Sequence, residues 1–285
     1  MNNRFIQIWK SAGPIFLSAL SLFLAFFLLQ PFALWLNPEW TLRASRDVGK
    51  VAFVVMVIYQ VVLLLSIQSR DFLHRFFQTN LFFFIEKGWF KKYLKFFSVF
   101  FLLHMLIILG LYFAGYVYFD ASWGALSISL VGRIFFGFFV AFLLAWTEEL
   151  IFRGTLFPYF EQTFSTFASL LITSFIFMFA HDVAAPWKMV TDNLSIGIGL
   201  FLLGFLLNVV FAVTQKLYIG MGIHSGLVAV KVFFRRVPCL KFVDSSLWGT
   251  LVNSDLRQSI IIHFLFLLLI VVLLVKYRRL LFKMA

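Results

Sequence analysis

Two adjacent carboxylates and an arginine stand at the end of an apolar run. Glu148, Glu149 and Arg153 follow the segment 134–145, which contains no ionisable residue. A charged side chain deep in a bilayer costs about 2.5 to 3.5 kcal/mol on insertion scales, so three of them close together require a reason. Arg153 comes four residues after Glu149, a spacing that allows an ion pair along one helix face. The pattern predicts a functional site inside a membrane.

Two histidines lie in later apolar segments. If the helices on either side of residues 163–165 form an antiparallel hairpin, Glu148 and His181 lie at the same height, because each is equally far from the turn. A second turn near residues 215–216 places His224 roughly 12 Å from that side, which is a similar depth if the first hairpin projects beyond the bilayer. A carboxylate in an apolar cavity can act as general base toward water, and a neighbouring histidine can donate to a developing oxyanion. This set predicts hydrolysis without a covalent intermediate.

Other hydrolytic chemistries lack their usual patterns. Neither Gly-x-Ser-x-Gly nor His-Glu-x-x-His occurs, and Cys239 is the only cysteine, so an intramolecular disulfide is excluded. We expect no cofactor. One alternative is a metal-dependent protease that binds zinc through His181, His224 and Glu148, since two histidines and a glutamate form a known catalytic set. A second is a non-catalytic membrane protein whose buried charges bind a ligand or conduct ions.

The composition defines the environment of these residues. The chain is 62% apolar, 20% aromatic and only 13% charged, with a mean hydropathy of +0.98, which is far too apolar for a water-soluble domain. The net charge is +12, but Lys and Arg cluster beside apolar runs as in cytoplasmic loops, so no nucleic-acid partner is expected. The sequence predicts an all-α, polytopic integral membrane protein with one transmembrane domain, residues 1–285.

Apolar runs of spanning length predict about eight transmembrane helices. Besides the helix that ends in the acidic motif, they are 14–36, 51–68, 96–119, 168–181, 194–214, 217–234 and 260–275. The stretch 69–95, with six basic residues among phenylalanines, predicts either a helix in the headgroup region or a solvated basic loop. His104, within the third span, predicts packing or interhelical hydrogen bonding rather than ligand binding.

The distribution of charge predicts the orientation. Eight spans place both termini on one side of the membrane. Lys and Arg are more numerous on that side, which predicts cytoplasmic termini in a cell inner or plasma membrane, although the segment 231–257 carries five basic residues on the other side.

Three short motifs resemble those of the CAAX protease and bacteriocin-processing family of intramembrane endopeptidases, which includes the type II prenyl-protein CAAX endopeptidases. They are Glu148-Glu149-x-x-x-Arg153, Phe177-x-x-x-His181, and His224 in a later helix. The resemblance covers about residues 131–236. It implies that the first glutamate activates water, that the second glutamate and the arginine support it, and that the histidines bind or protonate near the tetrahedral oxygen.

The resemblance also implies a substrate class and exposes one departure. The implied substrate is a peptide tail or leader, including lipidated proteins, while members proposed to act in bacteriocin self-immunity keep a non-catalytic alternative open. The family's third motif is usually His-x-x-x-Asn, and here Val228 follows His224 by four residues. Asn208 mirrors His224 across residue 216 and is a candidate for the missing amide, unless it only joins helices. Phe177 is expected in the cavity wall.

Overall fold

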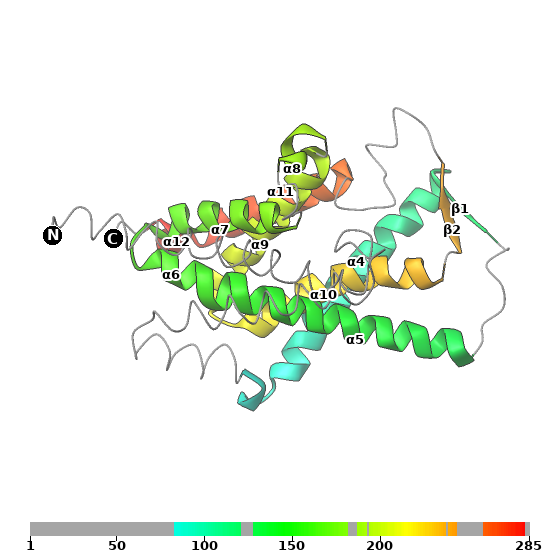
Figure 1. Cartoon of the computed structure of the whole chain (residues 1–285), viewed down its shortest axis with the longest axis horizontal. Helices are drawn as coiled ribbons and strands as arrows, with labels where there is room; N and C mark the ends of the chain where they lie inside the picture. The colour runs from blue at the N-terminus through cyan, green and yellow to red at the C-terminus, as the bar shows by residue number, and fades with distance from the viewer. Residues whose placement is uncertain are drawn as a thin grey trace, which may run out of the picture.

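The computed structural model describes residues 83–120, 128–181, 187–192, 194–237, 239–243 and 259–282. The predicted spans 14–36 and 51–68, most of the basic stretch 69–95 and both termini lie outside the described residues. The described part is mostly helical, and Figure 1 shows its long helix α5 (Ile128–Ile151) running beside α10 (Leu217–Arg236).

Among the described residues, four helices are long and apolar enough to cross a membrane. These spans are Trp89–Phe113 (α4), Leu130–Glu161 (α5 and its continuation), Leu194–Thr214 (α9) and Leu217–Phe234 of α10. Two shorter apolar helices, α7 (Thr166–Ala180) and α11 (Ile260–Lys276), pack against α9. The chain is therefore an integral membrane protein, while the count of eight spans and the single domain stay predictions.

Helix boundaries agree best where the local signals are strong. The observed bounds of α9 are the predicted ones, and α10 and α11 begin where expected. The hairpin turn before α7 is also in place: Ser165 is its N-cap, and the hydroxyl accepts a hydrogen bond from the amide of Ala168. The remaining short helices are η2 (Phe83–Ile85), α8 (Lys188–Thr191) and α12 (Arg278–Leu281).

The third span requires a correction, and one short strand pair lies within a structure that is otherwise mostly helical, as predicted. Helix α4 runs from Trp89 to Phe113 instead of 96–119, and Gly115 at φ 79° follows its end, a left-handed conformation that suits glycine. Strand β1 (Val117–Phe119) then pairs antiparallel with β2 (Leu240–Phe242). The pairing provides hydrogen bonds for backbone groups beyond the end of α4. Its partner segment is more than 100 residues away in sequence. Hydropathy therefore does not reveal the pairing.

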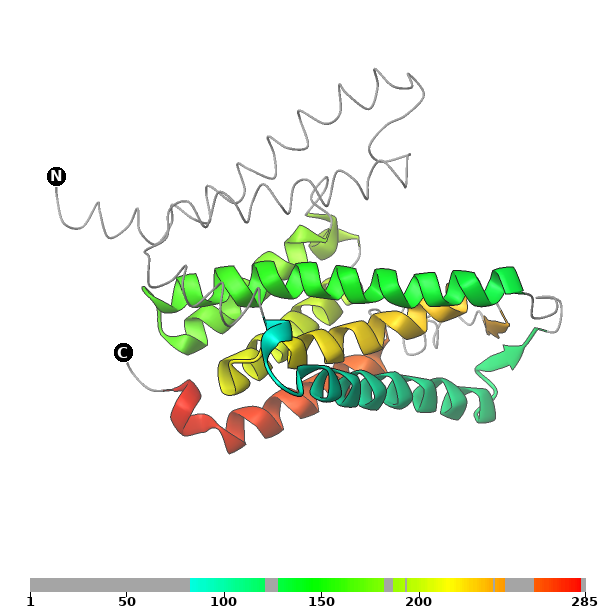
Figure 2. The same ribbon diagram turned by 90° about the horizontal axis from the view of Figure 1, so that it is seen from below.

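Helix α10 lies between α4 and α5, as Figure 2 shows. A Cβ atom on Gly222 would lie 2.7 Å from the carbonyl oxygen of Tyr93, and one on Gly226 would lie 2.6 Å from that of Phe97. Only glycines allow the two backbones to come so close, so these positions set the close packing of α10 against α4. The hydroxyls of Tyr93 and Ser225 add a hydrogen bond of 3.0 Å across the same interface.

Helix α9 is the centre of the described bundle, while α4, α5 and α11 expose large apolar side chains on one face. In the most apolar stretch of α9, 72% of the residues are buried, compared with 22% in α4. The exposed side chains include Leu102, Leu106, Phe135, Phe136, Phe264 and Leu268. Such faces are stable against lipid, so the bundle keeps its polar groups inside and its outer surface apolar.

Candidate active site

The acidic motif ends at an irregular helical turn. After α5 the chain forms a π-helical turn, Phe152–Leu156, and continues as the short helix α6 (Phe157–Glu161). Pro158 in the first turn of α6 has no amide hydrogen, so it cannot donate a hydrogen bond to the preceding turn. The π-helical turn lies just before this position. Turns of this kind are frequent at functional sites. The π-turn contains Arg153, whose side chain is fully buried.

Arg153 uses its whole guanidinium group. Nη1 lies 3.0 Å from Oε1 of Glu149, Nε donates to Oδ1 of Asn208 at 2.9 Å, and Nη2 donates to the carbonyl oxygen of Gly204 at 2.9 Å. The ring of Phe177 lies 4.7 Å from the guanidinium carbon. The predicted ion pair is therefore present, and the buried charge is compensated on all sides, which a buried cation requires.

Glu149 connects this ion pair to His224. Its Oε1 also lies 3.0 Å from Nδ1 of His224, and the carboxylate is only 1% exposed. Gly220 on α10 leaves room for it, because a Cβ atom there would lie 2.8 Å from Oε2. With Glu149 ionised beside Arg153, Nδ1 of His224 is the donor, so the ring is oriented with Nε2 pointing away from the pair.

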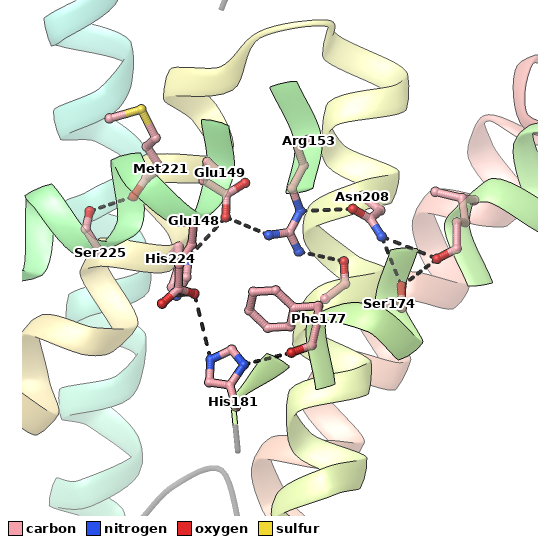
Figure 3. A network of polar contacts seen from close by, with 12 residues as sticks. Glu148, Glu149, Arg153, Ser174, Phe177, His181, Asn208, Met221, His224 and Ser225 are labelled. Atoms are coloured by element: carbon pink, nitrogen blue, oxygen red, sulfur yellow. Dashed lines mark hydrogen bonds and ion pairs between the residues drawn. The ribbon is translucent and has the colours of Figure 1, made fainter. Parts of the chain in front are cut away.

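His181 is oriented by the backbone of its own helix. It follows the last residue of α7, and its Nδ1 lies 2.8 Å from the carbonyl oxygen of Phe177, which can only accept a hydrogen bond. Nε2 of His181 and Nε2 of His224 each lie 3.7 Å from Oε2 of Glu148. Two imidazole nitrogens thus lie near one carboxylate oxygen, and Figure 3 shows the contact with His181 as a dashed line.

The expected meeting of acid and histidines is present in the structure. All these distances are well below the roughly 8 Å that one or two bridging waters can span. Oε2 of Glu148 is buried and has no hydrogen-bond partner among the described residues. A buried polar atom without a partner is unfavourable unless a ligand or water supplies one. The roles of these residues stay a prediction.

A cavity of about 290 Å³ opens beside this oxygen. Glu148, His181 and His224 line it together with apolar side chains of α5, α9, α10 and α11. The apolar lining includes Leu144, Leu200, Leu203, Val228, Ile262 and Phe266. The site therefore combines a small polar group of catalytic residue types with walls that fit apolar side chains or lipid.

Phe177 does not form the expected cavity wall. Its side chain is fully buried and is not among the residues that line the cavity. The ring packs behind the imidazoles, with its centroid 4.6 Å from that of His181 and 6.2 Å from that of His224. It also covers Arg153, so the aromatic residue of the motif supports the histidines and the guanidinium from the protein side.

Of the two alternatives for Asn208, its side-chain contacts favour the interhelical one. Its amide nitrogen donates to Oγ of Ser174 at 3.0 Å and to the carbonyl oxygen of Leu170 at 3.3 Å, while its oxygen accepts from Arg153. The side chain is fully buried and does not line the cavity. Asn208 instead joins α9 to α7 and orients Arg153, which corresponds to the interhelical alternative.

His104, for which the sequence predicts packing or interhelical hydrogen bonding, lies at the candidate site. It lines the same cavity as Glu148 and both motif histidines, and neither ring nitrogen has a partner of ordinary hydrogen-bond geometry among the described residues. Helix α4 is apolar around most of its surface, so its sequence does not indicate which face meets α10. His104 can be recognised as a cavity residue only when the packing of α4 against the glycines of α10 is known, and that packing is seen only in the structure.

Among the described residues, no group of three or more His, Cys, Asp and Glu side chains has an arrangement that could hold a metal ion. The zinc alternative with His181, His224 and Glu148 stays a prediction for experiment.

Comparison with known proteins bears on the central part of the chain. Residues 130–230 match the family described as Type II CAAX prenyl endopeptidase Rce1-like. Over these residues, the match agrees with the resemblance that the motifs carry. The matched segment begins in α5 and ends in α10, so it contains all three motifs. The family is a protease family, which supports a peptidase. Neither the curated proteins nor the solved structures contain a match to the chain.

Proposed function

We propose that this protein is an intramembrane endopeptidase in which Glu148 activates a water molecule. One observation carries the proposal: Nε2 atoms of His181 and His224 each lie 3.7 Å from Oε2 of Glu148, at the wall of an apolar cavity. A carboxylate with free capacity to accept hydrogen bonds, close to two oriented imidazoles, is the arrangement that water activation needs.

The reaction begins with proton transfer from water to Glu148 as the water oxygen attacks the carbonyl carbon of the scissile peptide bond. His224 in its protonated form donates from Nε2 to the developing oxyanion, and Glu149 stabilises that imidazolium through Nδ1 at 3.0 Å. His181, with Nδ1 on the Phe177 carbonyl, presents Nε2 to water or to the proton held by Glu148. The carbonyl then re-forms, Glu148 returns its proton to the leaving nitrogen, and the products are a carboxylate and an amine.

The substrate class follows from the walls of the cavity. Leucine, valine, isoleucine and phenylalanine side chains from four helices surround the polar group, so the segment that binds must be apolar or carry an apolar modification. The proposed substrates are a hydrophobic peptide tail, a leader peptide or a lipidated protein end.

The test uses the purified full-length protein in liposomes and a farnesylated peptide with a fluorophore and a quencher on opposite sides of the bond to be cut. Glu148→Gln keeps the shape and removes the base, so it should abolish cleavage while peptide binding stays within about two-fold. Glu161→Gln, which changes a glutamate of α6 that bonds to Thr166, is the matched control and should cleave normally. Equal cleavage by wild type and Glu148→Gln would refute the proposal.

The zinc alternative is separated in the same assay. Both Nδ1 atoms have acceptors, which leaves the Nε2 atoms facing Glu148, as in histidines that are oriented for metal binding. A strong chelator should leave cleavage unchanged if Glu148 acts as base toward free water. Loss of activity that added zinc restores would replace the glutamate-base mechanism with the metal-dependent one.

A further inference from the structure

His104 is a buried imidazole that interacts with the backbone of Leu227 only outside ordinary hydrogen-bond geometry. It is 3% exposed, and both ring nitrogens lack a partner of ordinary geometry. Leaving a polar group of this kind buried and unpaired is unfavourable. The ring lines the cavity that holds Glu148, His181 and His224, so a molecule bound in that cavity is the partner available to it.

The location of His104 matches the position where the third motif departs from its usual form. Val228, which stands where the motif has asparagine, lines the cavity as well, and His104 lies beside the backbone carbonyl of Leu227, the preceding residue. The close approach of α4 at Gly222 and Gly226 makes this possible. Helix α4 thus brings a polar ring to the region where α10 has Val228 instead of an asparagine.

Other candidates for the missing donor are less suitable. Both amide hydrogens of Asn208 point to α7, outside the cavity. Among the cavity-lining side chains outside the three motifs, only His104 and Lys231 carry N–H groups. Lys231 is exposed and already has an interaction partner. His104 is therefore the buried donor that a substrate in the cavity can use.

We propose that His104 donates a hydrogen bond to the carbonyl oxygen of the scissile bond and so replaces the motif asparagine absent at position 228. This inference rests on the proposed function. A neutral imidazole carries one N–H, enough to hold the oxygen as negative charge develops on it. The donor keeps its proton throughout, so the remaining steps of hydrolysis are unchanged.

The experiment measures cleavage of the farnesylated peptide by three variants in liposomes. His104→Ala should lower kcat about 100-fold with little change in KM, the loss typical of one oxyanion donor. His104→Leu, which fills the space without a donor, should be equally slow. Val228→Asn combined with His104→Ala restores the usual motif and should recover at least tenfold in kcat.

A second measurement tests the same donor without turnover. A peptide with a phosphinate in place of the scissile bond has tetrahedral oxygens like those of the intermediate. Its affinity should fall about 100-fold in His104→Ala. The affinity of the parent peptide, measured in the Glu148→Gln background, should not change with His104→Ala.

The outcomes are distinct. Full kcat in His104→Leu, or no recovery with Val228→Asn, would overturn the role of His104 while leaving the proposed function intact. Absence of cleavage by wild type would remove the proposed function and the donor together. Slow His104 variants, recovery by Val228→Asn and selective loss of phosphinate binding support the inference.

Discussion

Two polar groups inside the bundle differ in how completely their hydrogen bonds are satisfied. In the first, Arg153 bonds to Glu149, Asn208 and Gly204, so that each of its three guanidinium nitrogens has a partner. In the second, Oε2 of Glu148 and both ring nitrogens of His104 are buried without a partner of ordinary hydrogen-bond geometry among the described residues. The first group resembles a structural core, and the second resembles the polar part of a binding site. Position next to the cavity, rather than charge, separates them.

The largest effect is expected on activity in the unsatisfied group. Glu148→Gln should lower kcat by about 10²- to 10⁴-fold, the range for a general base, and leave thermal stability in detergent nearly unchanged, because no hydrogen bond to Oε2 is lost. Cleavage rate and melting temperature, measured on the same preparation, check this. A fall in melting temperature comparable to that of an Arg153 variant would erase the distinction between the two groups.

Substitutions in the first group, Arg153 and its partners, should lower the free energy of unfolding. Arg153→Met leaves the carboxylate of Glu149 buried without its cation and should destabilise the protein by about 3 to 5 kcal/mol. Lys92→Met, which breaks an exposed pair with Glu86 and a hydrogen bond to the hydroxyl of Tyr218, is the matched control and should change stability much less. Denaturant unfolding in mixed micelles compares the two. Similar losses in both variants would contradict the buried-pair account.

A smaller effect is expected where the two groups meet. Gly220→Ala places a methyl group against Oε2 of Glu149, whose other oxygen is held by Arg153 and His224, so the carboxylate must shift and disturb the orientation of His224. We expect kcat to fall about tenfold. Gly110→Ala, at a helical glycine with open space around its Cβ position, should keep full activity and gain up to about 1 kcal/mol from helix propensity. Equal kcat in both variants would show that Glu149 does not position His224.

The smallest effect concerns a pair outside the membrane-spanning segments. The hydrogen bond from Lys216 holds the pKa of Glu86 below its ordinary value of 4.5. A lowered folded-state pKa contributes stability above the unfolded pKa, and that contribution disappears as the pH falls through the folded value. Between about pH 6 and pH 3, wild type should therefore lose slightly more melting temperature than Glu86→Gln. If the curves of melting temperature against pH are parallel for the two proteins, the Glu86–Lys216 pair does not contribute in this way.

Much of the architecture and the composition of the site could be predicted from local patterns. The bounds of α9 and the turn at 215–216 agree because an apolar run between polar residues must form a helix of that length in a bilayer. The approach of Glu148 to His181 follows from helical rise and hairpin connectivity, which depend only on spacing along the chain, while that of His224 also required the first hairpin to project beyond the bilayer. The residue types of the motifs likewise define the chemistry without reference to packing.

Other features depended on which helix faces meet, and only the tertiary structure decided them. Asn208 turns to Arg153 and α7 instead of the cavity, Phe177 lies behind the imidazoles, and β1 forms because β2 is beside it. His104 enters the site because two glycines of α10 admit α4. Hydropathy determines the length and depth of a membrane helix, but a helix that is apolar around its surface carries no record of its rotation. That rotation follows from contacts with neighbouring helices, which are distant in sequence.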